Sequence, residues 1–199
     1  MKEYSASLAA GLDFSLLRWW MKRPAWPSLW GGLILLGGVL AMAGWLKTGV
    51  VLGAAGIGGL LLLRRWLAHV FSEGNAVPAM VIDLRPPLVG LLVDLTKDEE
   101  GPLAVKVLPY PGRRVLGERL CVGQRVPVAC TYCGKENDPL WTDVDPEWLE
   151  DGCGDKDALI RLLGKHPEEE WTILNDAVAG LPYRAAGVYR LDGGGLPME

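Results

Sequence analysis

The amino-acid sequence predicts a membrane-anchored α+β protein. In this prediction a two-helix transmembrane hairpin precedes a cytosolic domain with a small curved antiparallel sheet and C-terminal helices. Three observations support it. An uncharged run extends from Pro24 to Leu46, and a second follows from Thr48 to Leu63. Both lie in a basic first part of the chain. The acidic remainder has short alternating apolar segments, which are typical of half-buried strands, followed by helix-like segments.

Charge divides the 199-residue chain into two unlike parts. Residues 1–71 carry seven basic and two acidic side chains, whereas residues 72–199 carry 13 basic and 22 acidic ones. Half of all residues are apolar, which excludes a disordered chain, a collagen and a disulfide-rich secreted mini-protein. Because nucleic-acid binding needs a basic surface, the acidic soluble part also argues against a nucleic-acid partner.

We expect the hairpin over residues 24–71. A helix from Pro24 to Leu46 would rise about 34 Å, enough for a hydrocarbon core of about 30 Å. The second run is shorter and spans fully only if Lys47 or the residues after Leu63 reach the interface. Small residues along both runs predict close packing of the two helices, and their remaining faces leave a homo-oligomer open. Lys47-Thr48-Gly49 is expected to form the turn between them.

Flanking charges predict the orientation of the hairpin. Basic residues precede the first run and follow the second, whereas Lys47 alone lies between the runs. Cytoplasmic flanks are enriched in Lys and Arg, so both termini are expected in the cytoplasm. Residues 1–23 are expected to form an interfacial segment, with an amphipathic helix over residues 5–20 that lies on the lipid bilayer.

The cytosolic α+β domain is expected over residues 78–191, after a linker at 72–77 and before a flexible tail at 192–199. A capped helix is expected from Asp155 or Asp157 to Leu163, and another from Pro167 to about Leu181. Alternating apolar residues and turn signals predict strands at Ala79–Leu84, Leu88–Leu95, Leu103–Leu108, Arg125–Tyr132 and Ala185–Leu191. Short strands joined by tight turns favour a strongly curved sheet or a partial barrel.

Four short motifs follow the hairpin in a set order, at Pro78–Asp83, Gly123–Val128, Pro139–Pro146 and Glu170–Leu174. Together they resemble a family of uncharacterised bacterial proteins, a domain of unknown function found behind predicted transmembrane helices. The resemblance covers residues 75–190. It implies a location in the bacterial inner membrane, and it implies no activity, cofactor or catalytic residue.

An acidic segment offers candidate partner-binding residues. Asp143, Asp145 and Glu147 lie between Trp141 and Trp148. Exposed carboxylates favour a basic protein partner, and tryptophans are common anchors of such interfaces. The alternative is a solvated acidic surface whose tryptophans belong to the core. We therefore expect a non-enzymatic docking or adaptor module without a cofactor, since no histidine accompanies a recognisable nucleophile motif.

The cysteines suggest a different function. Cys130 and Cys133 have the spacing of a metal knuckle, and Cys153 and His166 would complete four zinc ligands. The sequence lacks a second Cys-x-x-Cys pair, so reduced thiols in a cytosolic core are the competing interpretation. A membrane-anchored zinc or thiol protein is thus one alternative function. An immunity-type inhibitor that masks a basic toxin is another.

The orientation gives a direct prediction. A reporter fused after Glu199 should be active only if it is of the type that works in the cytoplasm, because the positive flanks of the hairpin stay on that side. Paired fusions of a cytoplasmic and a periplasmic reporter in the same strain measure this. Activity of the periplasmic reporter at the C-terminus would overturn the orientation.

Overall fold

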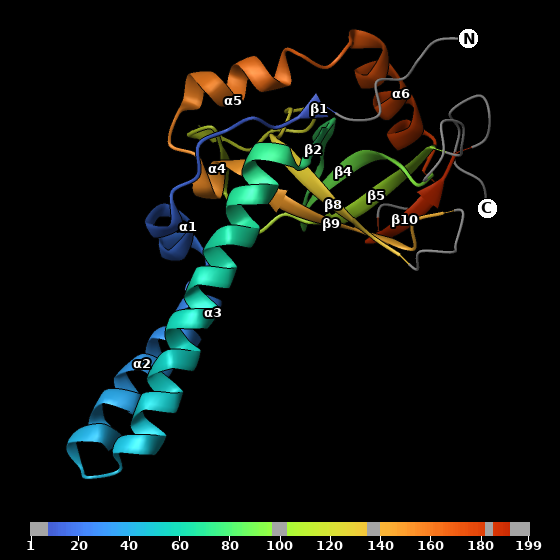
Figure 1. Cartoon of the computed structure of the whole chain (residues 1–199). Coiled ribbons are helices and arrows are strands. Elements are labelled where there is room, and N and C mark those ends of the chain that lie inside the picture. Colours follow the sequence, from blue (N-terminus) through green and yellow to red (C-terminus); the bar gives the residue numbers. More distant parts are fainter. Residues whose placement is uncertain (1–7, 97–102, 135–139, 182–184, 192–199) are drawn as a thin grey trace.

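The computed structural model describes residues 8–96, 103–134, 140–181 and 185–191. A long pair of helices projects from a domain of antiparallel sheets with helices on its outer faces (Figure 1). The α+β class is thereby confirmed. The expected tail at 192–199 and the first seven residues lie outside the described residues.

The projecting hairpin consists of α2 (Ala25–Met42) and α3 (Leu46–Glu73). Both helices are long and apolar enough to cross a membrane, and only 11% of each candidate span is buried within the structure. They are therefore unlike the core helices of a water-soluble domain, which are buried on at least one face. The turn occupies residues 43–45, slightly before the expected Lys47-Thr48-Gly49, because α3 already begins at Leu46.

Glycines bring the two helices of the hairpin into backbone contact. A Cβ atom added to Gly49 would lie 2.5 Å from the Gly37 carbonyl oxygen, and one added to Gly37 would lie 2.6 Å from that of Gly49. Farther along, a Cβ on Gly56 would lie 2.7 Å from the Trp30 carbonyl oxygen. The small residues that the sequence analysis singled out thus include the positions that need to lack a side chain.

Helix α3 continues without a break from the hairpin into the domain. Leu67, Val70 and Phe71 in its last turns are fully buried there. Strand β2 (Asn75–Val77) follows immediately and pairs with β8 (Val128–Cys133). The expected linker over residues 72–77 is therefore wrong: its polar, glycine-containing sequence forms a helix end and a paired strand.

The N-terminal segment packs on the domain. Strand β1 (Leu8–Ala9) pairs with β2, and the backbone N–H of Leu12 donates to the Phe71 carbonyl oxygen at 2.9 Å. Helix α1 covers only Leu16–Lys22, capped by Ser15, and its Trp19 is buried. An amphipathic helix over residues 5–20 is thus wrong in extent, because backbone hydrogen bonds to the domain hold residues 8–12 in a non-helical conformation.

Two four-stranded antiparallel sheets form the body of the domain. One has the order β1-β2-β8-β9, where β9 is Asp143–Trp148. The other has the order β10-β5-β4-β3, formed by Gly187–Arg190, Leu103–Pro109, Pro87–Asp94 and Ala79–Leu84. A two-stranded ribbon pairs β6 (Arg114–Val115) with β7 (Glu118–Arg119). The five expected strands are present with shifts at their ends, and β1, β2, β6, β7 and β9 are additional.

The two sheets share continuous stretches of chain. Residues 75–84 pass from β2 into β3 at Pro78, and the segment before β8 also pairs with β3: Val126 N–H donates to the Ala79 carbonyl oxygen at 2.8 Å. The sheets therefore curve around one apolar core that includes Val81, Leu91 and Val128. The curvature agrees with the expected partial barrel, and it brings the edge strands β9 and β10 to the same side.

Helices cover the outer faces of both sheets. Helix α6 (Glu168–Ala179) packs Leu174 and Val178 on the β10-β5-β4-β3 sheet. The end of α3, with α4 (Leu149–Gly152) and α5 (Lys156–Leu163), covers the other sheet. Three apolar clusters thus hold the domain together, and the hairpin enters one of them directly.

The hairpin packing predicts a position-specific effect of alanine. Gly49→Ala should lower the stability of the hairpin by about 1–3 kcal/mol, because its methyl group would collide with the Gly37 backbone. Gly53→Ala is the matched control, since nothing lies within 4 Å of its added Cβ. Thermal unfolding of the full chain in detergent measures both. Equal effects at the two positions would contradict this packing.

Candidate functional site

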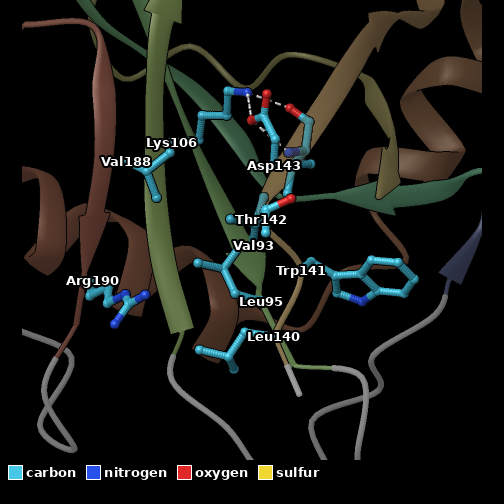
Figure 2. A pocket seen from close by; sticks show the side chains of 10 residues that line it. Val93, Leu95, Lys106, Leu140, Trp141, Thr142, Asp143, Val188 and Arg190 are labelled. Carbon is cyan, nitrogen blue, oxygen red and sulfur yellow. Dashed lines mark hydrogen bonds and ion pairs between the residues drawn. The ribbon is translucent and has the colours of Figure 1, made fainter. Parts of the chain in front are cut away.

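A groove opens at the seam between β9 and β10, where the curved sheets do not close. Figure 2 shows it, and we name it the seam groove. Its volume is about 500 Å³. Residues from four strands and from the segment before β9 line it: Val93, Leu95, Lys106, Leu140, Trp141, Thr142, Asp143, Val144, Val188 and Arg190.

A lysine closes one end of the seam groove. The Lys106 ammonium lies 2.7 Å from Oδ1 of Asp143 and donates to the Val144 carbonyl oxygen (Figure 2). Hydrogen bonding from Lys106 lowers the pKa of Asp143 below its ordinary value. This contact links β5 to β9 and satisfies a carbonyl on β9. One end of the groove is therefore polar and held by charge.

The other wall of the seam groove is apolar and open. In the β5–β10 register Val188 is opposite Lys106 and Arg190 is opposite Ala104, so Val188 and Arg190 face the inner side of the sheet. The Val188 side chain is 46% exposed, and Arg190 makes no ion pair with any residue that the structure describes. An extended chain with an apolar side chain fits this wall.

The structure divides the predicted acidic surface. Asp143 and Asp145 are exposed on β9, but Glu147 on the same strand is only 6% exposed. Trp148 is buried against Tyr110, with ring centroids 4.9 Å apart. Trp141 is half-buried beside Tyr132 and lines the seam groove. Of the five residues, three thus keep access to a partner, while Glu147 and Trp148 belong to the interior.

Glu147 belongs to a buried cluster with the N-terminal segment. Nη1 of Arg23 lies 3.0 Å from Oε2 of Glu147, and Nε of Arg23 donates to Asp151 at 3.1 Å. The Arg23 guanidinium also lies 5.9 Å from the Trp19 ring centroid. Burial raises the pKa of Glu147, although Arg23 favours its charged form. Sequence reasoning missed this pair because the two residues are far apart in the chain and meet only through the tertiary fold.

The four residues of the zinc alternative do not meet. Cys130 is buried between the sheets and Cys133 is exposed, because residues three apart on a strand point to opposite faces. Cys153 lies in the cluster below α3, and His166 lies 3.1 Å from Glu170 and edge-on to Trp171. Among the residues that the structure describes, no three potential metal ligands come together. Burial also raises the pKa of the Cys130 thiol, which disfavours the thiolate needed for a metal ligand or nucleophile.

The comparisons with known proteins give a family. The chain belongs to the family described as protein of unknown function (DUF3239), whose sequence model matches residues 66–181. The match starts in the last turns of α3 and ends just after α6, so it covers most of the sheet domain. The resemblance to an uncharacterised family is thus confirmed. Comparisons with curated proteins and with solved structures give no match.

The buried cluster predicts a pH-dependent effect of one substitution. Arg23→Gln should lower the free energy of unfolding by about 1–3 kcal/mol at neutral pH, because the Glu147 carboxylate loses its cation. A buried carboxyl with a raised pKa opposes folding when it is ionised. The difference in free energy of unfolding between Arg23→Gln and the wild type should therefore shrink as the pH falls and Glu147 becomes protonated. Unfolding of the full chain in detergent at several pH values measures it.

Two controls make this test specific. Adding Glu147→Gln to Arg23→Gln should recover part of the lost stability, since the buried charge is then absent. Lys156→Gln removes the exposed ion pair with Glu118 and should have little effect at any pH. A loss in Arg23→Gln that stays constant with pH would contradict the role given to Glu147.

Proposed function

We propose that this chain is a non-enzymatic integral membrane protein of the bacterial inner membrane, with both termini in the cytoplasm. It presents its acidic domain at a fixed position near the bilayer as a docking module for a basic protein partner. The observation that carries the docking proposal is the seam groove, which joins an open wall with the exposed Val188 to a polar end formed by Lys106 and Asp143.

The membrane part of the proposal is supported by the surface of the hairpin. Many of its large apolar side chains point outward and are mostly exposed, among them Leu35, Met42 and Val51. Such a surface is costly in water and favourable in lipid. The basic residues on both sides of the hairpin support the cytoplasmic placement of the domain.

The docking part is supported by the strand edges beside the seam groove. Strand β10 is the last strand in the order of its sheet and pairs with β5. An extended peptide can add to a sheet beside such an edge strand. Strand β9 contains Pro146, which protects its own edge, whereas residues 187–190 contain no proline. We therefore place an extended segment of the partner along β10, with an apolar side chain at Val188.

The basic character of the partner is supported by charge. Asp145 is exposed on β9, near Asp143 at the end of the groove, and residues 72–199 carry nine more acidic than basic side chains. A basic protein would be attracted to this domain, and its association would slow as salt screens the attraction over about 8 Å at physiological ionic strength.

Site-specific photo-crosslinking in intact cells tests the docking proposal. A photoreactive residue at position 188 should give a discrete adduct with a basic protein, identified by mass spectrometry. The same residue at Ile160, exposed on α5 away from the groove, should not. In a separate chain without a photoreactive residue, Val188→Asp should weaken binding of that protein about tenfold, because it places a charge on the wall formed by Val188. Equal adducts at both positions, or an acidic protein at position 188, would refute docking at this groove.

A further inference from the structure

We infer that α1 and three basic side chains beside it form a binding surface for anionic phospholipid headgroups. We call it the lipid-facing surface; it consists of Leu17, Met21, Lys22, Arg64 and Arg65. The inference rests on the proposed membrane insertion and adds to it a preference for one class of lipid. Docking of a protein partner involves the seam groove, which is formed by other residues.

Helix α1 has two apolar faces. Trp19 on one face is buried against the domain, beside Arg23. Leu17 and Met21 are spaced four residues apart, so they share a different face, and they are 68% and 71% exposed. The domain thus uses one face of α1 and leaves the other uncovered within the described structure.

The uncovered face of α1 is continuous with the surface of the hairpin. Helix α2 begins three residues after α1 ends, and its Trp26 is exposed. Trp20 on α1 approaches α2 near Gly31, where a Cβ would lie 3.9 Å from the indole. Figure 1 shows α1 beside α3, at the end of the hairpin that enters the domain. If lipid surrounds the hairpin, it also reaches Leu17 and Met21. These residues then lie at the membrane–water interface, where tryptophans are enriched.

Three cations, one at the end of α1 and two on α3, have no ion-pair partner among the described residues. Lys22, Arg64 and Arg65 are exposed and form no ion pair with the described residues, whereas Arg23 next to them is paired with both Glu147 and Asp151. Arg64 and Arg65 precede Leu67, the first large side chain of α3 that is fully buried. They therefore stand at the height where the helix leaves the apolar span.

Charge and depth together favour an anionic lipid as the occupant. Cations at the cytosolic surface of a bilayer attract anionic headgroups by about 1 kcal/mol each, which is about a fivefold change in affinity per side chain. A water-soluble anion would pair with the cations but would leave the apolar side chains of Leu17 and Met21 in water. It therefore fits this surface less well than a lipid does. The lipid headgroup and its acyl chain satisfy both features.

Lipid competition in reconstituted membranes tests the preference. The full chain is placed in phosphatidylcholine bilayers, and quenching of tryptophan fluorescence by brominated phosphatidylglycerol is compared with quenching by brominated phosphatidylcholine. The wild type should favour the anionic lipid at least fivefold. The triple variant Lys22→Gln, Arg64→Gln, Arg65→Gln should lose this preference. The matched triple Lys156→Gln, Arg161→Gln, Lys165→Gln, which removes three exposed cations from the α5 region, should keep it.

Spin-label depth measurements test the position of α1. With the exposed cysteines Cys121 and Cys133 replaced by serine, a nitroxide at Met21→Cys should be accessible to oxygen and protected from a water-soluble nickel complex. A nitroxide at Ile160→Cys should show the reverse. A label at position 21 that behaves like the one at position 160 would overturn the inference.

The two proposals fail differently. If alkaline carbonate extracts the chain from native membranes, membrane insertion itself is refuted. If the chain resists extraction but shows equal quenching by both lipids, or if the triple variant keeps the preference, the anionic-lipid inference is refuted while insertion stands.

Discussion

The burial of the last turns of α3 in the domain is the contact on which the rest of the structure depends. Leu67, Val70 and Phe71 join a helix of the hairpin to the apolar cluster that also holds α5 and the N-terminal segment. The helix cannot bend at this point without exposing three large side chains, each worth about 1.5–3 kcal/mol when buried. The hairpin and the domain consequently form one mechanical unit.

Electrostatics reinforces this connection between two parts of opposite charge. The basic N-terminal part and the acidic domain meet at Arg23, which faces Glu147 and Asp151. Removing charges from water is costly, and the pair offsets that cost only while α1 stays docked. The acidic composition of the domain is therefore partly a structural requirement, and only exposed carboxylates such as Asp145 remain free to act at long range.

The strands and helices that depend on apolar alternation or on a capping residue could be predicted from the local sequence. Strand β3 occupies Ala79–Leu84 as expected, and the helix that ends at Leu163 has the predicted Asp155 cap. Strand β9 was missed because Asp143–Trp148 contains three acids and a proline, and its stability comes from β8 and from a cation in a distant segment. The seam groove was also missed, since it arises from how two strand edges face each other. Of its lining residues, sequence reasoning had singled out Trp141 and Asp143 for their chemistry.

The unbroken path of α3 has a consequence for how the molecule responds to its surroundings. Helix α2 has 18 residues and is about 27 Å long, slightly less than the average hydrocarbon thickness of about 30 Å. Bilayers of different thickness impose different tilts on such helices, or adapt around them. Because no hinge separates α3 from the domain, a change in the tilt of the hairpin, inserted as proposed, would turn the whole sheet domain by the same angle. Membrane thickness would then set the direction in which the strand edges point.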